Sequence, residues 1–246
     1  MEDTLKRGIL FFDLPKRQAI WRISFYENHV KEIMKMNNEA AVNRKIRTQN
    51  RSKLRTTVQI GMLGAVAAVL MFFEFPIPFI APPFIKMDFS EIPVLVGTFA
   101  MGPLAGVFIE LLKNLLNLVI HGTTTMGVGE LSNFIIGCAF VVPAGLFYRK
   151  KKTRANALKG MVTGTLLMAV MGCLTNAFIM FPLYSTLMGI PMDSFIAMGT
   201  AIHPAIDNMV TFVILCMVPF NLLKGIVISF ITLLLYKRLR VLLKGE

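Results

Sequence analysis

Six apolar segments dominate the chain after residue 56 and limit what it can fold into. They are predicted as helices at residues 57–75, 94–100, 104–120, 131–148, 160–181 and 205–236. An α-helix rises about 1.5 Å per residue, so about 20 apolar residues are needed to cross the hydrocarbon core of a bilayer. The second segment is short, and the last is long enough that we expect it to tilt or protrude. The sequence therefore predicts an all-α integral membrane protein whose six transmembrane helices occupy residues 57–236.

The composition is too apolar for an ordinary soluble domain, and the basic residues are unevenly placed. Hydrophobic residues make up 55% of the chain, charged residues 16%, and the mean hydropathy is +0.64. Of the 26 Lys and Arg residues, 13 lie in residues 1–55, and most of the others lie in 149–159 and 236–244. With six spans these clusters fall on one side of the membrane, as the positive-inside rule requires. We therefore expect cytoplasmic N- and C-termini, a basic cytoplasmic tail at 237–246, and contact with lipid rather than nucleic acid.

Residues 1–56 form a separate polar and basic segment in which no membrane span fits. One hypothesis is a genuine cytoplasmic arm. The other is that translation starts at Met36, because Lys31-Glu32 can be encoded as AAGGAG, a bacterial ribosome-binding sequence. Both hypotheses remain open at this point.

A polar stripe runs along the predicted helix at 104–120. Its members are spaced at i, i+3, i+4, i+7 and i+11, which places them on one helix face: Glu110, Lys113, Asn114, Asn117 and His121. Ionisable groups are costly in a bilayer unless they face protein or a water-filled cavity, so the stripe is expected to face inward. Either Glu110 and Lys113 neutralise each other across one turn, or the stripe lines a ligand site.

Further polar groups are placed where they could complete such a site. Asn133, Asn176, Asn221 and Lys224 lie within other apolar segments, and Glu130 follows a Gly/Thr loop. The segment 76–93 contains five prolines and cannot form a continuous helix, yet it is apolar enough to cover a pocket. Amides match the carbonyl and N–H edges of a flat heteroaromatic solute, while Phe and Met side chains cover its faces.

Motifs for other chemistry are missing from the sequence. The phosphate-binding pattern GxxxxGK[ST], the zinc motif HExxH and the nucleophile motif GxSxG do not occur. The cysteines stand alone in apolar runs, without metal-ligand or disulfide spacing: Cys138, Cys173 and Cys216. We therefore predict neither a metal site nor catalytic residues. An intramembrane enzyme that uses Glu110, Glu130 and His203 is the alternative from a different class.

Several separated motifs carry a resemblance to a known family over residues 57–236. They are FPIPFIAPPFIKMDFSEIP, GPLAGVFIELLKNLLNL, TTTMGVGELSNFIIG and PFNLLKG. Together they resemble the riboflavin-specific S component of energy-coupling factor (ECF) vitamin transporters. The resemblance implies a multi-pass protein of the bacterial cell membrane with the S-component fold, which captures riboflavin from outside. It also implies a transmembrane T component and two cytoplasmic ATPases as partners, with ATP used by those subunits and no cofactor in this chain.

The resemblance also suggests roles for particular residues. It implies that Asn176, Asn221 and Lys224 bind the polar edge of the ligand, with Asn133 and Glu130 as further candidates. It implies that the loop around Phe84, Met87 and Asp88 closes over the ligand. Asn117, from the polar stripe, completes the predicted substrate-binding residues. Small residues spaced by four in the first helix match the family's T-component docking motif, with Gly where Ala is usual: Gly61, Gly64, Ala65 and Ala68.

Two alternatives remain beside this hypothesis. The small residues of the first helix could serve packing within the protein instead of docking. The ligand could be another vitamin or the phosphorylated flavin FMN. A phosphate-binding pocket is not evident, however, because only one intramembrane lysine and no arginine cluster are among the candidate residues.

Overall fold

The computed structural model of the protein describes residues 16–123, 126–189 and 191–244. The chain divides into two units, Met1–Arg55 and Thr56–Glu246. Residues 1–15 of the predicted arm and residues 245–246 of the predicted tail lie outside the described part. Each unit is described by itself below.

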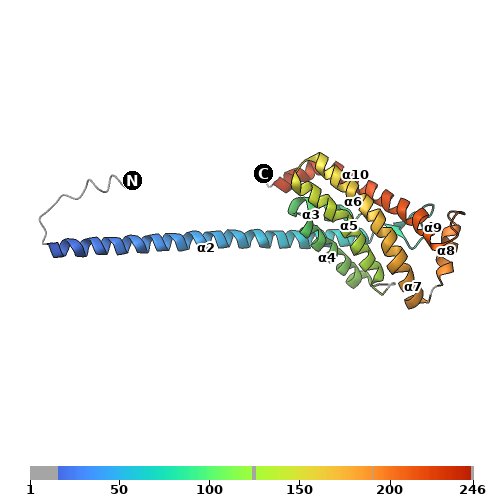
Figure 1. Ribbon diagram of the computed structural model, residues 1–246, viewed down its shortest axis with the longest axis horizontal. Helices are drawn as coiled ribbons and strands as arrows, with labels where there is room; N and C mark the ends of the chain where they lie inside the picture. Colours follow the sequence, from blue (N-terminus) through green and yellow to red (C-terminus); the bar gives the residue numbers. More distant parts are fainter. Residues whose placement is uncertain (1–15, 124–125, 190, 245–246) are drawn as a thin grey trace. The chain divides into compact units, whose positions relative to one another are not determined.

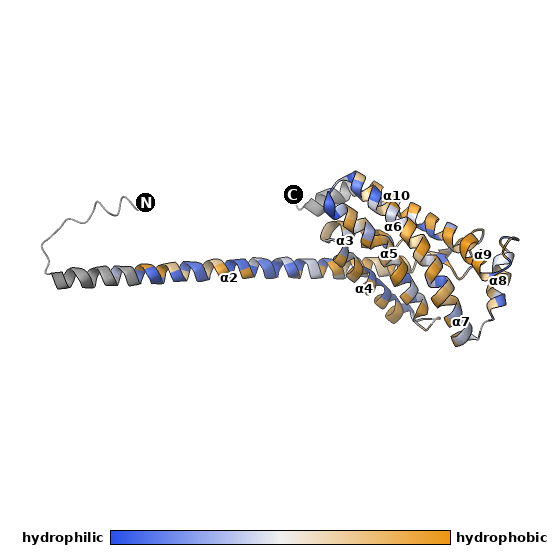
Figure 2. Ribbon diagram, viewed as in Figure 1, coloured by the Kyte–Doolittle hydropathy of each residue, from blue (hydrophilic) through white to orange (hydrophobic). Residues whose placement is uncertain are grey.

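The first unit consists of the N-terminal part of helix α2, which begins at Lys16 and ends at Met71. The described side chains of residues 29–55 are all exposed. Hydrophilic and hydrophobic residues alternate along this part of α2 without a continuous apolar face (Figure 2). The sequence predicted a polar arm here, and the structure shows that it is helical from Lys16 onward.

The second unit is a helical bundle with one small hairpin (Figure 1). Its elements after α2 are β1 Phe75–Pro76, β2 Lys86–Met87, α3 Glu91–Met101, α4 Pro103–His121, α5 Val128–Lys150, α6 Arg154–Thr175, η1 Asn176–Met180, α7 Phe181–Met188, α8 Met192–Thr200, α9 Met209–Phe212, η2 Val213–Met217 and α10 Val218–Lys244. Local signals set several boundaries. Gly102 adopts φ 101°, which ends α3, and Pro103 then occupies the first turn of α4.

The long helices pack side by side around one apolar core. α5 lies along both α4 and α6, α10 lies along α6, and α3 fills the space among α4, α5 and α10. The core includes Leu95 and Phe99 from α3 and Phe140 from α5. α5 and α6 come very close at Gly164, where an added Cβ would lie 2.3 Å from the backbone oxygen of Phe140. Glycine is therefore needed at this helix contact.

α4 is apolar on its outer face and polar on its inner face, the reverse of a helix in a soluble protein. Its buried residues include Glu110, Lys113, Asn114 and Asn117. Its exposed face carries the large apolar side chains Leu104, Phe108, Leu111, Leu115 and Val119. The outer face suits lipid, and the inward direction predicted for the polar stripe is confirmed for these buried residues. His121, the last member of the stripe, is exposed at the end of α4.

Five helices of the described residues are long and apolar enough to cross a membrane. The all-α class is confirmed, but the count of six spans stays a prediction. The predicted span at 94–100 corresponds to α3, which has 11 residues. At helical rise it is about 16 Å long, roughly half of the hydrocarbon core.

Several predicted boundaries are wrong, most of them in the C-terminal half. The helix predicted at 160–181 continues through η1 and α7 to Met188, and the first helix ends at Met71 rather than residue 75. The predicted loop at 185–204 contains α8, and the last span begins at Met209 rather than residue 205. The reason is tertiary: Phe181, Phe195 and Phe212 bury one another in a second apolar cluster, which makes a helix at α8 favourable.

Candidate functional site

A cavity of about 590 Å³ lies inside the second unit, bounded by α4, α5, α6, α10 and the segment 72–90, here called the first loop. Its polar lining includes Asp88, Asn117, Glu130, Ser132, Asn133, Asn176, Asn221 and Lys224. Its apolar lining includes Phe84, Met168, Met180, Tyr184, Met217 and Phe220. The volume is typical of a site for a small organic molecule, and the lining combines many apolar groups with a few polar ones.

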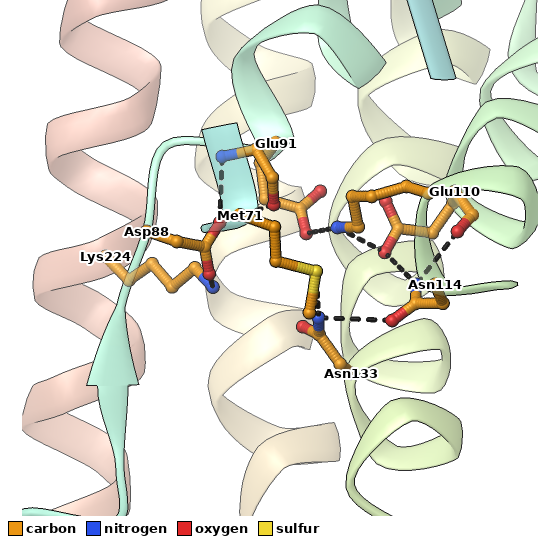
Figure 3. A network of polar contacts seen from close by, with 9 residues as sticks. Met71, Asp88, Glu91, Glu110, Asn114, Asn133 and Lys224 are labelled. Carbon is orange, nitrogen blue, oxygen red and sulfur yellow. Dashed lines mark hydrogen bonds and ion pairs between the residues drawn. The ribbon is translucent and has the colours of Figure 1, made fainter. Parts of the chain in front are cut away.

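The first loop is fixed over the cavity by a buried ion pair. Lys224 of α10 donates from Nζ to Oδ2 of Asp88 over 2.8 Å (Figure 3), and both side chains are buried. The other oxygen of Asp88, Oδ1, accepts from the backbone N–H of Ser90 at 2.8 Å and from the Ser90 hydroxyl. Asp88 therefore joins the first loop, the start of α3 and α10.

The pKa of Asp88, which lies outside the spanning helices, is lowered, so this carboxyl group is ionised at physiological pH. Burial raises the pKa, but the charges of Lys224 and Lys113 and the hydrogen bonds from Lys224 and Ser90 lower it from an ordinary 3.8 to about 2. A carboxyl group with a lowered pKa stabilises the fold at every pH above its ordinary value. That contribution is lost only as the pH falls toward about 2. The attachment is thus complete at physiological pH.

Apolar contacts hold the rest of the first loop. Ile77, Ala81 and Met87 pack with Phe220 of α10 in a third apolar cluster. β1 pairs antiparallel with β2, and across this hairpin Lys86 and Glu74 form an exposed ion pair of 2.5 Å. Phe84 is partly exposed and meets the ring of Phe195 edge to face at 5.8 Å. The prediction that the apolar proline segment covers a pocket agrees with this placement.

Two π-helical turns shape the wall formed by α6 and α10. η1 begins at Asn176, and η2 ends at Met217, so both interruptions lie against the cavity. π-turns inside helices are frequent at functional sites. Asn176 donates from Nδ2 to the Gly172 carbonyl oxygen at 2.7 Å, and Asn221 donates to the Met217 carbonyl oxygen at 2.9 Å. Among the described residues, none donates a hydrogen bond to Oδ1 of either amide.

Gly172 allows the two amides to share this wall. A Cβ at Gly172 would lie 2.5 Å from Nδ2 of Asn221, so any larger residue would displace that amide. Asn221 and Lys224 lie one turn apart on α10 and are both buried. The wall therefore presents amide oxygens and the remaining N–H groups of an ammonium to the cavity.

The facing wall is built from α4 and α5. Asn117 is buried on α4, and Asn133 is half-buried on α5. Asn133 donates from Nδ2 to Oδ1 of Asn114 over 3.2 Å (Figure 3). Near the mouth of this wall, Glu130 accepts a hydrogen bond from the Thr123 hydroxyl at 3.2 Å. This wall thus offers amide and carboxylate groups opposite the amides of α6 and α10.

Behind this wall lies a fully buried ion triad, Lys113 with Glu91 and Glu110. The Lys113 ammonium is 2.8 Å from Oε1 of Glu91 and 2.6 Å from Oε1 of Glu110, and all three side chains are 0% exposed. The hypothesis that Glu110 and Lys113 neutralise each other is confirmed, but it lacked the second carboxylate. The triad ties the first turn of α3 to the middle of α4.

The structure brings eight of the nine predicted substrate-binding residues to the cavity: Asn176, Asn221, Lys224, Asn133, Glu130, Asn117, Phe84 and Asp88. Met87 is 3% exposed and packs in the third apolar cluster instead. Whether each residue contacts a ligand stays a prediction.

The predicted docking residues of the first helix divide between two faces. Ala68 is buried, and a Cβ on Gly64 would lie 2.6 Å from Cδ2 of Leu112, so this pair packs within the protein. Ala65 is exposed, and a Cβ on Gly61 would meet nothing within 4 Å. Packing therefore accounts for one pair, and an outward surface of small residues remains at Gly61 and Ala65.

Sequence reasoning missed several residues that matter to the site. Glu91 is one of them, because nothing in the sequence indicates that it meets Lys113, 22 residues away. Asn114 was placed in the stripe but not in the site. Tyr184 and Met217 line the cavity because η1 and η2 shift the helix register there, and helical periodicity alone could not show this.

The arrangement is suited to binding rather than to metal chemistry. Within the described ranges, no group of three or more His, Cys, Asp or Glu side chains could hold a metal ion. The cavity combines hydrogen-bonding amides and a paired ammonium with the flat or polarisable surfaces of Phe, Tyr and Met. Such a lining recognises a planar solute with a polar edge.

We predict that Lys113→Met strongly destabilises the protein, because it leaves two buried carboxylates without their ammonium. The expected cost is roughly 3–5 kcal/mol, visible as a lower thermal unfolding temperature in detergent. Lys86→Met is the control: its pair with Glu74 is exposed, and losing such a pair costs about 0–1 kcal/mol. Equal shifts in the two variants would contradict the structural role of the triad.

Comparison with known proteins adds independent evidence. A family model described as the substrate-specific component of ECF transporters matches residues 55–236. The riboflavin transporter RibU of Staphylococcus aureus (strain TCH60) is 36% identical over 203 residues, which cover 82% of this chain and 97% of that protein. The riboflavin transporter FmnP of Bacillus subtilis (strain 168) is 31% identical over 189 residues, which cover 76% and 93%.

A solved structure agrees with these matches. It is described as the S component of a bacterial ECF transporter and has 35% sequence identity and a TM-score of 0.61, covering 78% of this chain and 99% of that one. With its apolar outer faces and spanning helices, the chain is a multi-pass protein of the bacterial cell membrane. The family match, the relatives and the fold lead to one conclusion: the chain belongs to the family of substrate-specific (S) components of ECF transporters.

Proposed function

We propose that this protein captures riboflavin in the cavity between α4, α5, α6 and α10 and serves its uptake through an ECF transporter. The observation that carries the proposal is the cavity, because polar groups of α10 and the first loop meet apolar and aromatic surfaces in one open space of about 590 Å³. The names of the relatives, riboflavin transporters RibU and FmnP, support the same ligand.

The chemistry of riboflavin suits both walls. Its isoalloxazine ring is planar with a polar edge of carbonyl and N–H groups, which Asn176, Asn221 and Lys224 can bind. Met168, Met217 and Tyr184 supply surfaces for the ring faces. The ribityl hydroxyls, which both donate and accept, need polar groups of the kind that Asn117, Glu130 and Asn133 provide.

Charge in the cavity favours riboflavin over FMN. The two lysines that line it are both paired, Lys224 with Asp88 at 2.8 Å and Lys86 with Glu74 at 2.5 Å. No arginine is among the described residues of the lining. A phosphate dianion would therefore lack an uncommitted cation, whereas a neutral flavin needs none.

The proposed transport cycle requires partner subunits. The sequence has no phosphate-binding GxxxxGK[ST] loop, so we propose that two cytoplasmic ATPases supply the energy and a transmembrane T component couples them to this chain. Riboflavin is then cargo, and this chain needs no cofactor of its own. The basic clusters at 44–55 and 149–154 support cytoplasmic termini and a cavity that opens to the outside.

The intramembrane enzyme is not the function, because the family is a transporter component. The three side chains that the enzyme would use also have different partners and do not form one site. Glu110 is bound to Lys113 in the buried triad, Glu130 lines the cavity, and the ring of His203 accepts a hydrogen bond from the Ala205 N–H within its own turn.

The direct test is the absorption spectrum and affinity of the purified protein. We expect bound flavin to absorb visible light in the protein as isolated or after incubation with riboflavin, and riboflavin fluorescence to be quenched on titration. FMN should compete much more weakly, because its phosphate finds no free cation. A protein that binds neither flavin but binds another vitamin tightly would refute the proposed ligand.

We predict that Asn221→Ala and Lys224→Ala each weaken riboflavin binding by about 1–3 kcal/mol, roughly 5- to 150-fold in Kd. Lys224→Ala also leaves Asp88 unpaired, so Asp88→Asn/Lys224→Met separates the two effects, since this double variant leaves no unpaired charge. If Lys224 contacts the ligand, the double variant still binds weakly. Wild-type affinity in the double variant would mean that Lys224→Ala weakens binding only through the unpaired charge of Asp88, and that neither a ligand contact of Lys224 nor the ion pair is needed for affinity. Thr163→Ala, at a partly exposed position of α6 outside the cavity lining, is the control.

We predict that Ala65→Leu leaves riboflavin affinity unchanged but reduces uptake by the assembled transporter. The reason is that Ala65 and Gly61 are the outward small residues of α2, where another helix can approach closely. Met62→Leu is the matched control, because Met62 is 65% exposed on the same helix and already large. Uptake measured in cells or proteoliposomes that is equal for both variants would remove the docking proposal.

A further inference from the structure

The direction of hydrogen bonding is fixed along a chain of groups that leads from the buried triad to the cavity (Figure 3). Lys113 can only donate, and it donates to Oε1 of Glu110 over 2.6 Å. Oε1 of Glu110 already accepts from this ammonium, and the Glu110 backbone oxygen can only accept. The side chain that follows must therefore turn a donor toward Glu110.

Asn114 is that next side chain. Its Nδ2 donates to the Glu110 backbone oxygen at 2.8 Å and to Glu110 Oε1 at 3.0 Å. A flipped amide would place its oxygen against two acceptors, so only one orientation satisfies both contacts. The oxygen of Asn114 consequently points away from Glu110, toward α5.

Asn133 is the next side chain in this series of hydrogen bonds and lies at the edge of the cavity. Its Nδ2 donates to Oδ1 of Asn114 at 3.2 Å and lies 3.9 Å from Sδ of Met71. In Figure 3 its oxygen points away from Asn114, on the side where Lys224 lies. Within the part of the chain that the structure describes, no group donates to that oxygen. Because Asn133 is half-buried and lines the cavity, its free oxygen is available to a ligand.

We propose that Asn114 is a positioning residue that holds the Asn133 amide with its oxygen toward the cavity, so that Asn133 accepts a hydrogen bond from an N–H or O–H group of the ligand. The site then selects ligands that present a donor at this place and rejects those that present an acceptor. This inference rests on the proposed function, in which the donor is either the ring N3–H or a ribityl hydroxyl of riboflavin.

The test compares the affinities of the purified full-length protein for riboflavin and for two analogues that each lack one kind of donor. N3-methylriboflavin lacks the ring N–H, and lumiflavin lacks the ribityl hydroxyls. We expect the wild-type protein to bind at least one analogue about tenfold or more weakly than riboflavin, the loss of about one hydrogen bond. The affinity ratio is the Kd for that analogue divided by the Kd for riboflavin. In Asn133→Leu, this ratio should be about tenfold lower than in the wild-type protein.

Two substitutions at Asn114 test the positioning role. Asn114→Leu removes the acceptor that orients Asn133. The affinity ratio should therefore fall about tenfold, as expected in Asn133→Leu. Asn114→Asp is the conservative rescue. Facing the Glu110 oxygens it takes up a proton, so its O–H replaces the donated N–H while its carbonyl still accepts from Asn133. We expect this variant to keep the wild-type ratio even if its riboflavin affinity falls.

The outcomes separate this inference from the proposed function. A wild-type protein that does not bind riboflavin refutes the function itself. Normal riboflavin binding with no loss for either analogue, or an unchanged ratio in Asn133→Leu, overturns the acceptor role of Asn133. An unchanged ratio in folded Asn114→Leu, or a collapsed ratio in Asn114→Asp, overturns the positioning role. Thermal unfolding and riboflavin binding of each variant report whether it is folded.

Discussion

The ammonium group of Lys113, paired with Glu91 and Glu110 at full burial, is the interaction on which the polar interior of this membrane protein depends. An unpaired charge at such a position would cost several kcal/mol, so the three side chains must stay together. Their contacts fix the start of α3 against the middle of α4. A helix of only 11 residues, shorter than the hydrocarbon core, is thereby held at a defined depth.

Both polar edges of the cavity are connected to this triad. On one side, Glu91 begins α3 directly after Ser90, whose N–H and hydroxyl bind Asp88, and Asp88 binds Lys224 of α10. On the other side, Glu110 orients Asn114, which orients Asn133 of α5. The first loop, α5 and α10 are thus positioned by one continuous set of charges and amides, which explains why polar residues are retained deep in an apolar bundle.

The sequence predicted most of the polar side of this arrangement and little of its connectivity. Helical spacing placed Glu110 and Lys113 on one inward face, and the apolar residues between them left lipid as the only favourable environment for the other face. The stripe together with the family motifs then indicated eight residues that line the cavity. Glu91 as the second partner of Lys113, and Asn114 as a link to Asn133, could not be found, since periodicity reports neighbours within a helix and not across helices.

The sequence by itself determined that the chain is a helical membrane protein, which faces of its helices are polar, and the family to which it belongs, because these depend on apolar length, period and motif. Only the tertiary structure decided that Gly64 and Ala68 pack inward while Ala65 points outward, that α8 is a helix, and where η1 and η2 interrupt their helices. Those features depend on contacts between segments distant in the chain. Burial of Phe181 against Phe195 and Phe212, for example, contributes more to the structure there than local sequence preference does.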